Sequence, residues 1–291
     1  MSRVKFLFLM FFNCTHAASS QQKTESLDLT KHPGLILDLD AAQGLTLENK
    51  NRVASWKSNL PLLPEADFVK RDEGRKEKGT GRPTLIPIAN GLKAHPAISF
   101  RHQELINMEE DRFDHLSQGI GHTWVAVISV HEQRVGLKDV NSFFGNLKNS
   151  GHYEGIWACL NDDNTLWWGA RNGHTMGRFD PNNPKITGPK LIPDQFYVIA
   201  GRMAKGTGSV PVDLFVNSAK PVATGTFPVN PDANPSKLAV GQERDAIQHP
   251  GYESFDGQIA RFLIWDHPLE DNELASVMKA LCNFYLPSEN P

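Results

Sequence analysis

The chain has 291 residues, 40% of them hydrophobic, and a net charge of −3. Its acidic side chains outnumber its basic ones and no basic stripe offsets that balance, which argues against a nucleic-acid backbone as partner. No apolar run in the sequence reaches membrane-spanning length, and the chain length suits one domain with a large core.

The N-terminus has the pattern of a secretory signal peptide. Arg3 and Lys5 precede the apolar run 6–12, and Thr15-His16-Ala17 offers a cleavage site. The apolar run is too short to span a bilayer. We therefore expect residues 1–17 to be removed on export to a secreted or periplasmic location, which leaves 28 basic and 33 acidic side chains and a net charge of −5.

Two cysteines remain after that cleavage, Cys159 and Cys282. In an oxidising compartment they could form one disulfide. However, Cys159 lies in a strand-like run and Cys282 on an apolar helical stretch, so the sequence favours two separately buried thiols.

Short β-branched segments, separated by turn residues, follow a polar lead-in at 18–32. The long segment 61–81 is rich in Pro, Gly and charge, and its composition favours a flexible insertion. The sequence predicts strands at 35–40, 53–57, 82–87, 97–100, 123–130, 155–160, 165–169, 196–202, 212–216 and 238–242.

The segment 259–265 carries apolar side chains on both faces, so it belongs at the centre of a layered fold. Arg261 is a charge within it that needs a partner or a route to water. After Pro268, the spacing of Leu274, Val277, Met278 and Leu281 predicts a helix with one apolar face. Together these signals predict an all-β protein, an antiparallel jelly-roll β-sandwich with one C-terminal helix, over residues 33–287.

The order of several short motifs carries a family resemblance. They are 34–40 (GLILDLD), 53–56 (VASW), 82–85 (RPTL), 94–100 (AHPAISF), 214–217 (LFVN), 238–241 (LAVG) and 255–260 (FDGQIA), followed by the Pro268-Leu269 helix start. In this order the chain resembles the laminin-G-like branch of the concanavalin A-like lectin/glucanase jelly rolls, and more narrowly its versions in secreted planctomycete proteins. The resemblance implies a lectin, an adhesion module, or a glycan hydrolase or lyase. Asn217-Ser218 departs from the Asn-Gly frequent in that family, which predicts a longer turn.

Catalytic signals are sparse. The Glu-x-Asp-x-x-Glu pattern of the glucan-hydrolase branch is absent, because the nearest stretch, 65–70, ends in lysine. Glu243 and Asp245 would share one face of a strand at roughly 6–7 Å, a separation open to either glycosidase geometry. With His249 they form the alternative catalytic set; the other interpretation is a structural turn with a salt bridge through Arg244.

Calcium is the one metal with some support. Asp162 and Asp163, between Asn161 and Asn164, offer oxygen ligands in one turn, although the same residues also form turns without metal. Glu253 and Asp256 are a second candidate pair. The chain has no His-Glu-x-x-His and no paired-cysteine motif, so zinc has no support.

Adjacent Trp167 and Trp168 must point to opposite faces of a strand, so one is expected in the core and the other outward. We expect Trp168, with Arg171, His174 and Tyr252, to form a carbohydrate-binding surface. The sequence thus favours non-catalytic recognition of a glycan or, second, of an extracellular protein. A glycan-active enzyme stays open as the alternative.

Overall fold

The computed structural model describes residues 27–60, 67–70, 81–133, 140–150, 152–174, 184–243 and 253–288. The predicted signal peptide, most of the lead-in, and the candidate residues Asp245, His249 and Tyr252 lie outside this range.

Strands dominate the described chain, with one 3-10 helix and one α-helix. The elements are β1 (Leu35–Asp40), β2 (Leu45–Glu48), β3 (Arg52–Lys57), β4 (Asp67–Lys70), β5 (Thr84–Ile86), β6 (Ala97–Arg101), β7 (Leu105–Asn107), η1 (Asp114–Ser117), β8 (His122–Val130), β9 (Asn141–Gly145), β10 (Lys148–Ser150), β11 (His152–Leu160), β12 (Thr165–Asn172), β13 (Lys185–Lys190), β14 (Phe196–Met203), β15 (Gly208–Val216), β16 (Pro221–Val229), β17 (Ala239–Val240), β18 (Asp256–Trp265) and α1 (Asp271–Tyr285).

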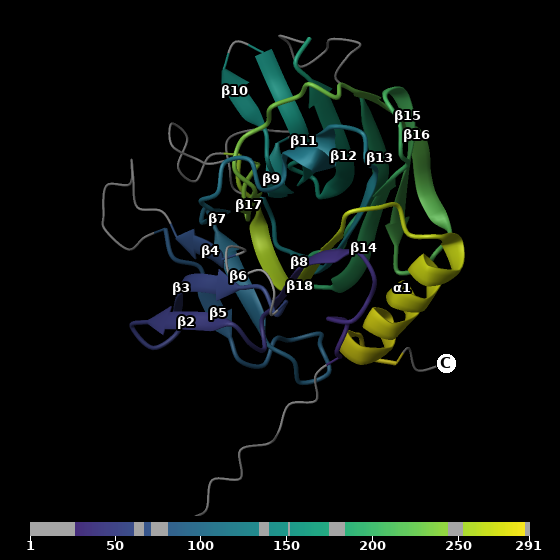
Figure 1. The fold of residues 1–291 in the computed structure, drawn as a ribbon. Coiled ribbons are helices and arrows are strands. Elements are labelled where there is room, and N and C mark those ends of the chain that lie inside the picture. Colours follow the sequence, from purple (N-terminus) through teal and green to yellow (C-terminus); the bar gives the residue numbers. More distant parts are fainter. Residues whose placement is uncertain are drawn as a thin grey trace, which may run out of the picture.

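The strands pair antiparallel in one ribbon that folds into two layers (Figure 1). One layer runs β13–β12–β11–β9–β17–β7, and the other runs β6–β18–β8–β14–β15–β16. Strands β4, β3 and β5 join the two at one side. This arrangement confirms the predicted antiparallel sandwich with one C-terminal helix.

Strand β18 lies at the centre of its layer, as its sequence predicts. It pairs with β8 on one side, and on the other with β6 and then β1. A bulge between Ile259 and Arg261 marks the change of partner. Phe262 and Ile264 face the core between the layers, whereas Leu263 and Trp265 face outward.

Helix α1 covers that outward face. Its predicted apolar residues Leu274, Val277, Met278 and Leu281 are all buried against it. Glu270 and Glu273 form a capping box at its start. No helix in the described part of the chain is long and apolar enough to cross a membrane.

Cys159 and Cys282 are free thiols, but the predicted burial of both holds only for Cys159. Cys159 is buried on β11, where its Sγ lies 2.7 Å from Ser142 Oγ. Cys282 is half-buried on α1.

Candidate functional site

The adjacent tryptophans of β12 lie on its two opposite faces. We expected Trp168 to face outward, but in the structure Trp167 faces outward and Trp168 lies in the core. Trp168 is fully buried in the core between the layers, 5.6 Å from the ring of Trp124. Trp167 and Arg171 lie on the opposite face of the strand, away from that core. The alternation is therefore confirmed, but Trp168 as a sugar-stacking residue is wrong, because no part of its ring reaches solvent.

The outer face of β11 and β12 carries a pair of indoles. Trp157 and Trp167 meet edge to face, with centroids 5.7 Å apart. Both rings extend over Gly169, which pairs with Trp157; a Cβ there would lie 2.9 Å from Trp167 Cζ3 and 3.4 Å from Trp157 Cζ2. Glycine at 169 thus leaves the space that the two rings fill. We call Trp157 and Trp167 the indole pair.

Two cations lie against this pair. The Arg171 guanidinium stacks 4.3 Å from the Tyr153 ring centroid and 5.1 Å from that of Trp157. The ammonium of Lys185, on β13, lies 5.0 Å from the Trp167 ring. Tyr153 and Arg171 are half-buried and Lys185 is exposed. The surface above the indole pair therefore combines ring faces, aliphatic stems and N–H donors.

The indole nitrogens of the pair have no acceptor. Trp157 and Trp167 are only 5% and 4% exposed, yet Nε1 of each is buried without a hydrogen-bond partner. An unsatisfied buried donor costs about 1–3 kcal/mol. Nε1 of the core residues Trp124 and Trp168 is also without a partner, so the indole pair is set apart by its place on an outer sheet face. A ligand oxygen would satisfy its two donors.

Glu243 borders the same face. It is 5% exposed, and its carbonyl oxygen accepts from the Leu147 N–H at 3.1 Å. That carbonyl passes close over Gly145, the β9 residue paired with Trp157, where a side chain would collide with it. The other two members of the alternative catalytic set lie outside the described residues.

The remaining predicted sugar contacts divide. Arg171 lies on β12 and stacks on Tyr153 and Trp157, whereas the sequence placed it in the following loop; its contact with sugar stays a prediction. His174 is exposed in the turn after β12, and its backbone N–H donates to Asn172 Oδ1 at 3.0 Å. The sequence analysis did not predict Tyr153 or Lys185 at this surface. The alternation of β11, which puts Tyr153, Trp157 and Cys159 on one face, could have identified Tyr153.

One acid of the predicted calcium turn, Asp163, contacts the protein's own groups. Asp163 Oδ1 accepts from the Thr165 N–H at 2.9 Å, and the hydrogen bonds from Thr165 lower the pKa of Asp163. Its Oδ2 lies 3.9 Å from Lys190 Nζ. Asp162 is exposed beside it. These contacts match the turn-forming interpretation.

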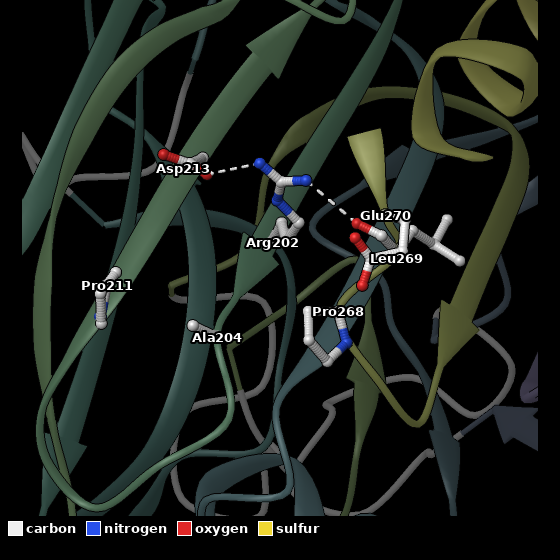
Figure 2. A pocket seen from close by; sticks show the side chains of 7 residues that line it. All are labelled: Arg202, Ala204, Pro211, Asp213, Pro268, Leu269 and Glu270. Carbon is white, nitrogen blue, oxygen red and sulfur yellow. Dashed lines mark hydrogen bonds and ion pairs between the residues drawn. The ribbon is translucent and has the colours of Figure 1, made fainter. Parts of the chain in front are cut away.

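One surface pocket of about 210 Å³ opens between the β14–β15 hairpin and the start of α1 (Figure 2). Arg202 dominates it, but its guanidinium already donates to Asp213 at 2.9 Å, to Asp271 at 2.7 Å and to the Leu269 carbonyl at 3.0 Å. The pocket therefore reflects how α1 is fixed to the sheet.

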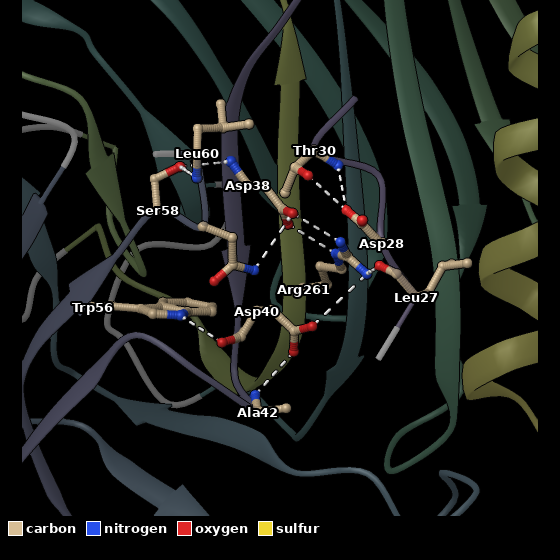
Figure 3. Close-up of polar contacts among 11 residues, drawn as sticks. Leu27, Asp28, Thr30, Asp38, Asp40, Ala42, Trp56, Ser58, Leu60 and Arg261 are labelled. Carbon is tan, nitrogen blue, oxygen red and sulfur yellow. Dashed lines mark hydrogen bonds and ion pairs between the residues drawn. The ribbon is translucent and has the colours of Figure 1, made fainter. Parts of the chain in front are cut away.

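A second pocket, of about 220 Å³, lies over Arg261. Arg261 donates to both carboxylate oxygens of Asp38, at 2.9 and 2.8 Å, and to the Leu27 carbonyl at 2.7 Å (Figure 3). Burial alone would lower the pKa of Arg261, but the hydrogen bonds and charge of Asp38 raise it. The isolated charge of the central strand thus has a buried partner, and its donors are used within the protein.

No protein-family model and no curated protein matches the sequence. The fold is similar to that of a Trypanosoma rangeli sialidase in complex with 2,3-difluorosialic acid, with a TM-score of 0.50 and 12% identity over 84% of this chain and 33% of the sialidase.

Two smaller structures also align. One is domain 4 of AbnA, an extracellular GH43 arabinanase from Geobacillus stearothermophilus, with arabinotriose (TM-score 0.48, 17% identity, 84% of this chain and 98% of that one). The other is the CBM40 of a Ruminococcus gnavus sialidase bound to α2,3 sialyllactose (TM-score 0.46, 16% identity, 62% and 95%). At these identities the similarity concerns the fold alone. The laminin-G-like assignment and the planctomycete type stay predictions.

Proposed function

We propose that this protein binds carbohydrate, without acting on it chemically, at the outer face of β11 and β12. The observation that carries the proposal is the indole pair, whose two buried N–H donors lack acceptors. Sugars offer hydroxyl oxygens that accept such donors and C–H faces that pack on rings and guanidinium planes. Tyr153 and Arg171 supply those planes at the surface.

A ligand can reach the pair by displacing the lysine above it. Lys185 is exposed, and an exposed cation–π contact is worth only about 0.5–1 kcal/mol. A sugar hydroxyl that takes the Trp167 N–H would recover more, since a satisfied buried donor removes a cost of about 1–3 kcal/mol.

The two adjacent tryptophans provide a matched test. Trp167→Phe and Trp168→Phe each delete one indole N–H, on opposite faces of the same strand. On a glycan array, Trp167→Phe should lower the affinity for the best-bound glycan about tenfold, the equivalent of one hydrogen bond of about 1.4 kcal/mol. Trp168→Phe should leave binding within about twofold while it lowers the melting temperature. Equal losses in both variants, or no glycan bound by the wild type, would reject the proposal.

A further inference from the structure

The segment before β1 lies on the outer face of the β18 layer, next to α1. We call residues 27–32 the strap. Leu27 and Leu29 pack against the apolar cluster that β18 and α1 form. Arg261 donates to the Leu27 carbonyl, and the strap supplies part of the lining of the pocket over Arg261 (Figure 3). The strap therefore covers one end of the outer face of the central strand.

A side-chain hydrogen bond ties the strap to Trp265. The Trp265 ring is 0% exposed, and its indole N–H donates to His32 Nδ1 at 3.0 Å. The two rings meet edge to face, with centroids 5.5 Å apart. Because an indole nitrogen can only donate, His32 Nδ1 must accept, which requires a neutral imidazole with its proton on Nε2.

The same nitrogen has a second partner within reach for its protonated state. His32 Nδ1 lies 3.4 Å from the Pro33 carbonyl oxygen. An imidazolium has a proton on both nitrogens and accepts no hydrogen bond. On protonation, Nδ1 can donate to Pro33, whereas the buried N–H of Trp265 loses its acceptor, which is unfavourable. His32 thus has two arrangements, and its charge selects between them.

The groups around the strap do not offset this change. The charged and titratable ones are Lys31, Asp28, Arg261, Asp266 and His267. Hydrogen bonds from Thr30 lower the pKa of Asp28, which keeps that carboxylate ionised at mildly acidic pH. His267 Nδ1 lies 3.0 Å from Asp266 Oδ1, so protonation of His267 strengthens its contact. Acid therefore weakens the strap at His32 and not at His267.

We propose that the strap is an acid-released cover: protonation of His32 detaches residues 27–32 from Trp265 and opens the pocket over Arg261. Histidine is the side chain that ordinarily changes charge between pH 5 and 8, so release follows acidification over that range. In the closed state the Leu27 carbonyl occupies a guanidinium N–H of Arg261. In the open state that N–H faces solvent and can bind an external acceptor. This inference does not depend on sugar binding at the indole pair.

The test is an NMR titration of the ¹⁵N-labelled protein from pH 7.5 to 5.0. In the wild type, the indole N–H signal of Trp265 should move upfield as its acceptor is lost. The signal of Trp56, which donates to the Asp40 carbonyl at 3.0 Å, should stay in place. The His32 amide donates to the Leu29 carbonyl at 2.9 Å, and its protection from hydrogen exchange, corrected for intrinsic pH dependence, should fall about tenfold.

Two matched variants assign the transition. His32→Asn puts an amide oxygen in the place of Nδ1 and cannot be protonated, so its Trp265 signal and strap protection should stay constant. His267→Asn removes the neighbouring imidazole and should keep the wild-type transition. A transition that persists in His32→Asn would overturn the proposal. So would a transition abolished in His267→Asn, a wild type without a transition, or a Trp265 shift with no loss of strap protection.

Discussion

Arg261 and Asp38, 223 residues apart in the chain, form a bidentate ion pair in which both side chains are 0% exposed. The pair lies at the bulge of β18, where the strand changes partner from β6 to β1. Because Asp38 is on β1, the contact fixes the first strand of the sandwich to the last. Arg261 also donates to the Leu27 carbonyl, so the same guanidinium fixes the segment that precedes β1.

Removal of one partner should be strongly destabilising. Arg261→Met leaves Asp38 buried without a counter-charge, and we expect it to lower the free energy of unfolding by about 3–5 kcal/mol in urea titrations. Arg261→Met/Asp38→Leu should recover most of that loss. As a control, Lys57→Met breaks an ion pair with Asp67 whose lysine is 57% exposed, and should change stability by less than about 1 kcal/mol. A double variant no more stable than Arg261→Met would contradict this account.

Acid should destabilise the fold through His122. Burial, reinforced by the charge of His115, lowers the pKa of His122 to about 3 from 6.5. Between these values the unfolded chain binds the proton and the folded chain does not. The contribution of neutral His122 to the free energy of unfolding is therefore complete above pH 6.5. It decreases as the pH falls, by about 3 kcal/mol at pH 4. In urea titrations from pH 7 to 4, His122→Gln should show a shallower loss of stability; an unchanged slope would refute the assignment.

Asp114 should act in the opposite direction. Burial, followed by the charges of Asp111 and Glu110, raises the pKa of Asp114 from 3.8 to about 6. The folded state then binds the proton of Asp114 more tightly than the unfolded state does. The stabilisation by protonated Asp114 is therefore complete below pH 3.8 and is lost as the pH rises through 6. Asp114→Asn should therefore raise the melting temperature at pH 7 relative to the wild type, with little difference at pH 4. A destabilised variant at pH 7 would show that the carboxylate has a favourable partner.

The two described cysteines should differ in reactivity without ever pairing. Labelling by iodoacetamide, followed by peptide mapping, should modify half-buried Cys282 slowly in the native protein, more slowly than a free thiol since burial raises its pKa. Cys159, fully buried, should be modified only in denaturant. Recovery of a peptide that links Cys159 to Cys282 would contradict the structure.

Local sequence patterns were sufficient to predict the fold. Two patterns predict burial without any knowledge of distant partners. One is the apolar run of β18, which leaves neither face of the strand polar; the other is the helical spacing of Leu274, Val277, Met278 and Leu281. The structure confirms both. The same periodicity placed Trp167 and Trp168 on opposite faces, but it could not tell which face the other sheet covers. That depends on packing against the other layer, where Trp168 meets Trp124 of β8 and Phe227 of β16, and the outward residue was therefore misassigned.

Long-range partners account for the other differences. Nothing adjacent to Arg261 in sequence identifies Asp38 as its counter-charge, since the contact requires β1 and β18 to pair. By contrast, the acids at 162 and 163 formed the more obvious cluster in sequence, and the structure gives Asp163 contacts within the protein.

The most direct test of the central claim is an NMR titration of the ¹⁵N-labelled indole N–H signals with the glycan that the array ranks first. The account predicts that the signals of Trp157 and Trp167 shift downfield and saturate together as their free donors bind sugar oxygens, while that of Trp168 stays in place. Shifts confined to other tryptophans, or an unchanged indole pair at saturating glycan, would contradict it.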